Sequence, residues 1–102
     1  MMPSKLATYI GFAIKSGKVI FGYDKLFEAR KIPNVVLICS TLNEKNTNKI
    51  IEFCNNYSIK YYKLKELVLG EIIKRDNCKV IGIIDKNLSN VISNEMDLLN
   101  GN

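Results

Sequence analysis

Two short runs of consecutive apolar residues place the strongest constraint on the fold of this chain. Residues 35–39 read VVLIC, and residues 80–84 read VIGII. A strand with one face in water alternates apolar and polar residues, whereas a strand covered on both faces is apolar throughout. Both runs have the length of a strand, so we expect two strands inside a sheet that has helices on both sides.

Helical and strand-like segments alternate along the rest of the chain. Further strands are expected at residues 19–21 and 59–63. Apolar residues at helical spacing predict helices that begin at Ser4, after Gly22, after Asn43, at Lys65 and after Asp85. The alternation predicts an α/β fold with a mostly parallel sheet.

The ends of these helices are marked by residues that stop or cap a helix. Gly17 and Pro33 are expected to end the first two helices, the second of which carries Leu26, Phe27 and Arg30. Asparagine and aspartate before a helix accept hydrogen bonds from free backbone amides, so Asn43 and Asp85 are expected caps. We expect a loosely ordered tail from about Asn94.

The length and the hydrophobic pattern indicate how many domains the chain forms and where the protein is located. We expect a single domain over residues 1–102, because 102 residues are enough for one core. Every apolar run is far shorter than the about 20 residues of a membrane-spanning helix. Neither a signal peptide nor a membrane partner is indicated, which predicts a cytoplasmic protein. The absence of heptads and of a broad apolar stripe predicts a monomer.

The sequence contains no histidine, which excludes several kinds of catalytic site. Ser–His–Asp and Cys–His catalysis are impossible, and the commonest metal ligand is missing. Cys39, Cys54 and Cys78 are widely spaced and lack the CxxC pairs of a zinc site, so we expect reduced thiols in the core. We predict a protein that is not an enzyme and that has neither a catalytic residue, a cofactor nor a metal site.

The positive charge is concentrated in two segments. The formal net charge is +5, and residues 1–31 carry six Lys or Arg against two acids. Residues 60–79 carry six against three, whereas the intervening segment is balanced. Clustered basic charge is the electrostatic footprint of a phosphate-binding surface, although solvated surface lysines produce the same pattern.

Gly17 and Lys18 invite comparison with a phosphate-binding loop. The GxxxxGK[ST] and GxGxxG patterns are both absent, which excludes the common nucleotide-binding motifs. Gly22 lies between an expected strand and an expected helix, where free backbone amides bind anions and a missing side chain lets RNA approach. A turn glycine explains the same position, so Gly22 alone does not predict a binding site.

The order of the segments resembles the ribosomal protein L7Ae/L30e superfamily. The matching stretches are IGFAIKSGKVIFG (10–22), NVVLICSTLNEKNTNKIIEFCNNYSIKYY (34–62) and LGEIIKRDNCKVIGIID (69–85), and the resemblance runs from about residue 5 to residue 93. Within the superfamily, the chain is most similar to the small bacterial YlxQ type. The resemblance implies a three-layer α/β/α sandwich around a four-stranded mixed sheet. It also implies binding to structured RNA, typically a kink-turn.

The resemblance further implies two RNA-binding segments. In the family, the first is a strand-to-helix turn in which Gly-x-Asn-Glu is followed three residues later by Lys, and the second is the loop before the last strand. The matching positions here are Gly22, Asp24, Lys25 and Glu28 in the first segment and Arg75, Asp76 and Asn77 in the second. Both segments lie in the two basic regions. Lys18, in the first basic region, completes the candidate RNA-binding residues.

At three positions the first segment departs from the family pattern. Asp24 replaces an Asn, and an ionised carboxylate only accepts hydrogen bonds whereas an amide also donates them. Lys25 replaces a Glu, and Glu28 replaces a Lys. Two functions therefore stay open. The chain binds structured RNA, kink-turn-like or ribosomal, or it is a protein-interaction module of the translation machinery that has lost kink-turn specificity and binds ribosome-associated proteins.

Overall fold

The computed structural model describes residues 4–64, 73 and 78–99. Its helices are α1 (Ser4–Lys15), α2 (Tyr23–Glu28), α3 (Glu44–Asn56) and α5 (Lys86–Leu99), and its strands are β1 (Val19–Phe21), β2 (Val35–Cys39), β3 (Lys60–Leu64) and β4 (Val80–Ile83). The order of these elements is the predicted one. The helix expected over residues 65–74 and the following loop lie outside the described residues, apart from the buried Ile73.

The strands form one mixed sheet in the order β1-β4-β2-β3. β4 runs antiparallel to both of its neighbours, whereas β2 and β3 are parallel. The mostly parallel sheet expected from the alternation of elements is therefore wrong, and the mixed sheet implied by the family resemblance is confirmed. Alternation indicates which segments are buried, but it does not indicate strand direction, because a connecting segment can return the chain to either end of the sheet.

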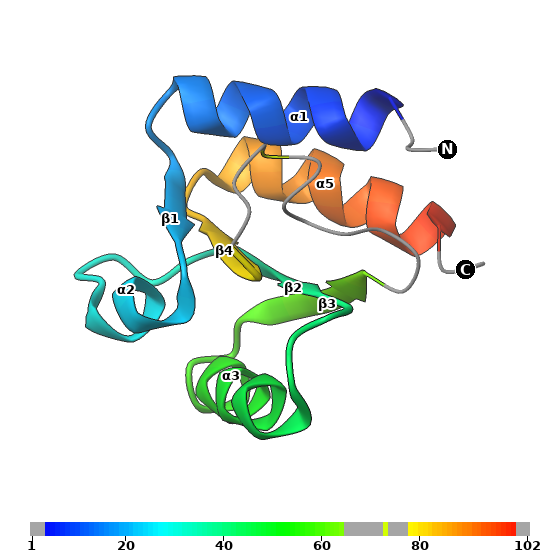
Figure 1. Ribbon diagram of the computed structural model, residues 1–102. Coiled ribbons are helices and arrows are strands. Elements are labelled where there is room, and N and C mark those ends of the chain that lie inside the picture. The colour runs from blue at the N-terminus through cyan, green and yellow to red at the C-terminus, as the bar shows by residue number, and fades with distance from the viewer. Residues whose placement is uncertain (1–3, 65–72, 74–77, 100–102) are drawn as a thin grey trace.

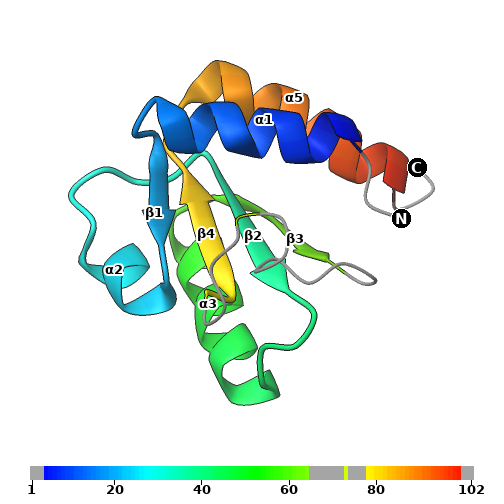
Figure 2. The same ribbon diagram turned by 45° about the horizontal axis from the view of Figure 1, so that its top comes forward.

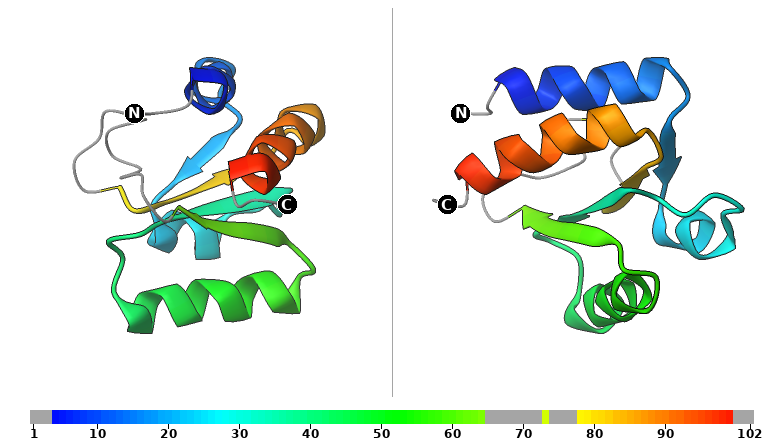
Figure 3. Two further views of the ribbon diagram at one scale, coloured as in Figure 1. Left: turned by 90° about the vertical axis from the view of Figure 1, so that its right-hand side faces the viewer. Right: turned by 180° about the vertical axis from the view of Figure 1, so that it is seen from behind.

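Helices cover both faces of the sheet (Figures 1 and 3). α1 and α5 lie side by side on one face and run in opposite directions, as Figure 2 also shows, and α2 and α3 cover the other face. One core contains Leu6 of α1, Ile92 of α5 and Leu37 of β2. The other contains Leu26 of α2 and Ile50 of α3. The fold is thus a three-layer α/β/α sandwich.

The local predictions of burial and capping are confirmed. All five residues of β2 are fully buried, as expected for a strand covered on both faces. The Asn43 side-chain oxygen accepts a hydrogen bond from the Asn46 amide at 2.8 Å, which caps α3. The Asp85 carboxylate accepts one from the Leu88 amide at 2.8 Å and caps α5.

Two helix ends differ from the prediction. α2 ends at Glu28, because Ala29 has an extended backbone, so Arg30 lies outside the helix. α5 instead continues to Leu99, which makes the expected loose tail from Asn94 wrong over residues 94–99. Two tertiary contacts hold this end: Met96 is buried, and the Tyr62 hydroxyl donates to the Asp97 carboxylate at 2.9 Å. Neither contact is visible in the helical periodicity.

Gly82 in β4 allows α2 to approach the sheet closely. A Cβ atom at Gly82 would lie 2.9 Å from Cδ1 of Leu26 and 2.9 Å from Cγ of Pro33. These two side chains therefore occupy the space that a side chain at Gly82 would need. The contact holds α2, and with it the turn that precedes α2, against β4.

Candidate RNA interface

The turn between β1 and α2 has a backbone conformation that glycine adopts most readily. Gly22 has a φ of 83° and a ψ of 150°, a region that is essentially restricted to glycine. A Cβ atom there would meet no atom within 4 Å, so the restriction comes from the backbone and not from crowding. Gly22 is therefore required for the turn, and it also leaves the backbone uncovered at this point.

Hydrogen bonds join this turn to the start of β4. The Gly22 amide donates to the Val80 carbonyl at 3.0 Å, and the Leu26 amide donates to the Gly22 carbonyl at 3.1 Å, which begins α2. Val80 follows Asn77 by three residues. The first predicted RNA-binding segment, which contains Gly22, therefore lies beside Val80, a residue that shortly follows the second predicted segment.

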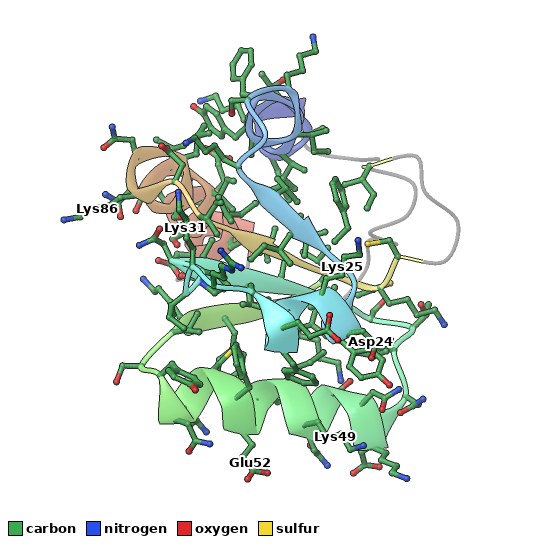
Figure 4. All side chains as sticks on the ribbon, turned by 90° about the vertical axis from the view of Figure 1, so that its left-hand side faces the viewer. Asp24, Lys25, Lys31, Lys49, Glu52 and Lys86 are labelled. Carbon is green, nitrogen blue, oxygen red and sulfur yellow. The ribbon has the colours of Figure 1, made fainter. Side chains whose placement is uncertain are left out.

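A hollow of about 400 Å³ opens where these segments meet. Its wall combines apolar and charged residues, namely Phe21, Gly22, Tyr23, Asp24, Lys25, Leu42, Lys79 and Val80. Asp24, Lys25 and Lys79 are exposed, so a carboxylate and two ammonium groups border an apolar wall. Figure 4 shows Asp24 and Lys25 on this side of the molecule. Such a lining offers apolar contact to a flat group and hydrogen-bonding partners to its edge or to a phosphate.

The structure brings only some of the predicted site residues together. Gly22, Asp24 and Lys25 line the hollow. Glu28 is exposed at the end of α2, one helical turn beyond Asp24, and does not line it. Lys18 precedes β1 and so lies at the opposite end of that strand from Gly22. The loop candidates, Arg75, Asp76 and Asn77, lie outside the described residues.

Five residues of the hollow were not among the sequence candidates, and Lys79 and Leu42 are the two that lie in neither β1, α2 nor β4. The Lys79 ammonium donates to the Thr41 carbonyl at 3.5 Å, so Lys79 links the start of β4 to the connection between β2 and α3. The sequence contains a signal for Lys79, because it lies in the second basic region directly before a buried strand. Leu42 has no comparable signal, since an apolar residue before a helix predicts only core packing.

A row of aromatic rings runs from the hollow across α2 and α3. The ring centroids of Tyr23 and Phe27 are 5.6 Å apart, those of Phe27 and Phe53 are 5.2 Å apart, and those of Phe53 and Tyr57 are 5.0 Å apart. The exposed fraction is 38% for Phe27 and 55% for Tyr57. We call these four residues the aromatic row, and it forms an apolar surface next to the charged one.

The described residues show neither a metal-binding cluster nor a membrane-spanning helix. Within residues 4–64, 73 and 78–99, no group of three His, Cys, Asp or Glu side chains lies close enough to hold a metal ion. No helix in the same part of the chain is long and apolar enough to cross a bilayer. The three cysteines are free thiols, and burial raises the pKa of the Cys54 thiol to about 11, which keeps it protonated at neutral pH.

The fold is similar to that of a solved protein of unknown function from Bacillus halodurans. The TM-score is 0.82 at 20% sequence identity, and the match covers 93% of this chain and 99% of the other. No curated protein matches the chain. The sequence profile of the ribosomal protein L7Ae/L30e/S12e/Gadd45 family matches residues 4–93, and members of that family are generally non-catalytic RNA-binding proteins. The chain therefore belongs to the ribosomal protein L7Ae/L30e/S12e/Gadd45 family.

Proposed function

We propose that this protein binds structured RNA, that it catalyses no reaction, and that the β1–α2 turn and the start of β4 form its RNA contact surface. Family membership supports RNA binding of the ribosomal-protein type. The observation that carries the proposed surface is the hydrogen bond from the Gly22 amide to the Val80 carbonyl, at 3.0 Å. It joins Gly22, in the first region that the charge distribution and the family resemblance indicate, to Val80, which directly follows the second basic region.

The hollow beside Gly22 has chemistry that suits an unpaired nucleotide. Proteins bind unstacked bases through apolar and aromatic contacts and through hydrogen bonds to the base edge. Phe21 and Tyr23 provide aromatic side chains there, and Asp24 accepts hydrogen bonds from amino and imino groups. Lys25 and Lys79 supply positive charge for the adjoining phosphates.

The proposed partner is a kink-turn-like or ribosomal RNA within a ribonucleoprotein of the translation machinery. Among members of the family, we place the protein nearest the YlxQ type, as a cytoplasmic monomer. Arg75, Asp76 and Asn77 belong to the proposed surface because they directly precede Cys78, Lys79 and β4 in the sequence and match the second RNA-binding segment of the family pattern. An arginine at this position suits a phosphate, which its guanidinium group can bind through two parallel hydrogen bonds.

A titration with two RNAs tests this function. The protein is titrated against a labelled kink-turn RNA and against a control RNA that lacks the sheared G·A pairs, each at two salt concentrations. We expect salt-sensitive binding to both RNAs and tighter binding to the kink-turn. Lys25→Glu and Arg75→Glu are expected to weaken binding while circular dichroism stays unchanged. Lys63→Glu, an exposed change on β3, serves as the matched control.

The outcomes distinguish general RNA binding from specificity for the kink-turn. Equal, salt-sensitive binding to both RNAs would contradict kink-turn specificity and leave a basic RNA-binding protein with another target. Binding to neither RNA would contradict the proposed function. Unchanged binding by Lys25→Glu and Arg75→Glu would show that the contact surface is elsewhere.

A protein-interaction module of the translation machinery is the second candidate function, and the aromatic row favours it. Aromatic residues are enriched in protein interfaces, and Phe27 and Tyr57 are exposed here. A partner that is retained after nuclease treatment and lost from the double variant Phe27→Ser/Tyr57→Ser would support this function. A partner that is released by nuclease would support RNA binding instead.

A further inference from the structure

The position of Lys18 draws attention to the end of β1 that the RNA contact surface does not use. Lys18 directly precedes β1, and Gly22 directly follows it. The Ile84 amide donates to the Lys18 carbonyl at 2.9 Å, whereas the Gly22 amide donates to the Val80 carbonyl. The two residues therefore lie beside opposite ends of β4, separated by roughly 13 Å of extended backbone. A ligand confined to the hollow does not explain the lysine at this end.

Two more lysines reach the same end of the sheet from other segments. The Asn34 amide donates to the Ile83 carbonyl at 2.8 Å, which brings the connection that contains Lys31 to the end of β4. Lys86 begins α5 directly after that end. Figure 4 shows Lys31 and Lys86 on the same side of the molecule, away from Asp24 and Lys25. We call Lys18, Lys31 and Lys86 the distal basic edge.

The lysines of the distal basic edge are not held in ion pairs by the described part of the chain. None of its three ammonium groups forms an ion pair with another described residue, and Lys31 and Lys86 are exposed. The adjacent acid, Asp85, accepts a hydrogen bond from the Leu88 amide as the cap of α5. Like charges that gather from three separate segments are the footprint of a phosphate-binding surface.

We propose that the distal basic edge binds the phosphate backbone of a duplex arm of the same RNA that the β1–α2 turn binds. This inference rests on the proposed function. A duplex arm of about ten base pairs is roughly 30 Å long, so a single arm can reach both ends of β1. Lysine binds a phosphate as a point charge and reads no base, so this edge contributes affinity and orientation but no discrimination between RNA sequences.

A triple variant with a charge-matched control tests the proposal. Lys18→Gln/Lys31→Gln/Lys86→Gln and the control Lys5→Gln/Lys49→Gln/Lys63→Gln each lower the formal net charge from +5 to +2. Each protein is titrated with a labelled kink-turn RNA whose arms have about ten base pairs, over a series of salt concentrations. The slope of log K against log salt is expected to become shallower by about 2–3 for the edge variant, and by less than about 1 for the control.

A second readout separates phosphate contacts from a structural defect. The ratio of kink-turn to control-RNA affinity is expected to stay within about twofold of the parent for the edge variant, because phosphate contacts carry no sequence information. An edge variant with the same salt slope as its control overturns this inference, while RNA binding by the parent still supports the proposed function. Binding of neither RNA by the parent overturns both. Thermal melting followed by circular dichroism verifies that all three proteins are folded.

Discussion

The two ends of β1 present different kinds of surface. At one end, Gly22 holds a special backbone conformation beside a hollow of about 400 Å³, and charges of both signs border it through Asp24 and Lys25. At the other end, Lys18, Lys31 and Lys86 outnumber the adjacent acid, Asp85, whose carboxylate caps α5. A fixed hollow with directed hydrogen bonds discriminates between ligand shapes, whereas a cluster of lysines attracts any phosphate. The comparison suggests that specificity and general affinity for RNA are separated along one strand.

The largest effect on this comparison is expected from Gly22→Ala. The alanine must adopt a φ of 83° and a ψ of 150°, which costs about 1–3 kcal/mol in the free energy of unfolding or forces the turn to rearrange. If the turn rearranges, discrimination between the kink-turn RNA and its control RNA should be lost. The contribution of the distal basic edge to the salt dependence of binding should remain. Urea denaturation and the two-RNA titration measure the two effects.

Gly11→Ala is the matched control for this prediction. Gly11 lies inside α1, and a Cβ atom there meets no atom within 4 Å. Alanine in a helix interior should stabilise the protein by about 0.5–1 kcal/mol and leave RNA binding unchanged. A Gly22→Ala variant as stable as the parent, with unchanged RNA discrimination, would remove the distinction between the two ends.

The next largest effect is expected from Asp24→Asn. Asparagine is the residue of the kink-turn-binding pattern that this segment resembles, and it would restore a donor beside the hollow. We expect an increase of about tenfold in the preference for the kink-turn over its control, which corresponds to about 1.4 kcal/mol. Because Asp24 is exposed, the free energy of unfolding should change by less than about 0.5 kcal/mol. If the Asp24→Asn variant and the parent protein prefer the kink-turn RNA to the same degree, Asp24 lies outside the RNA contact surface.

A third prediction concerns Cys54, which lies in the core beneath α2 and the Gly22 turn. Cys54 of α3 is buried in the same cluster as Leu26 of α2, and burial raises the pKa of its thiol from 9.0 to about 11. The folded protein therefore binds this proton more tightly than the unfolded chain. The resulting stability is complete below pH 9 and is lost as the pH rises through about 11. At pH 10 the loss should be about 1 kcal/mol.

Urea denaturation at pH 8 and pH 10 checks this prediction. Cys54→Ala lacks the thiol, so its stability should decrease less between the two pH values than that of the parent. An equal decrease in both proteins would show that the Cys54 thiol does not contribute to the alkaline loss.

The smallest effect is expected from Lys79→Gln. One phosphate contact fewer should make the salt slope shallower by about 0.7–0.9. Lys63→Gln, which is also exposed and lies on β3, is the control and should leave the slope unchanged. If both variants change the slope equally, Lys79 acts only through the net charge of the protein.

Local chemistry explains which features were predictable from the sequence. Asn43 and Asp85 cap helices because each side chain reaches an amide three residues ahead, so no distant part of the chain is involved. The apolar run of β2 likewise predicts its own burial. The position of Gly22 between a strand and a helix indicated a turn, and the family resemblance indicated its partner segment.

Contacts between distant segments explain what was missed. The end of α5 is held by Met96 in the core and by the hydrogen bond between Tyr62 and Asp97, which are 35 residues apart. The antiparallel position of β4 between β1 and β2 likewise depends on pairing across the whole chain. Lys79 lines the hollow because it directly precedes β4, which begins beside Gly22. The pairing of β1 with β4 also places Lys18 beside the opposite end of β4.

The sequence by itself determined the order of the elements, the buried strands, the helix caps and the two basic regions, because each depends on neighbouring residues and on local periodicity. Only the tertiary structure decided which charges share a surface. Strand direction and pairing set that outcome, and both arise from packing between residues far apart in the chain. Lys18 and Lys25 belong to one basic segment of the sequence, and the geometry of β1 places them on two different surfaces.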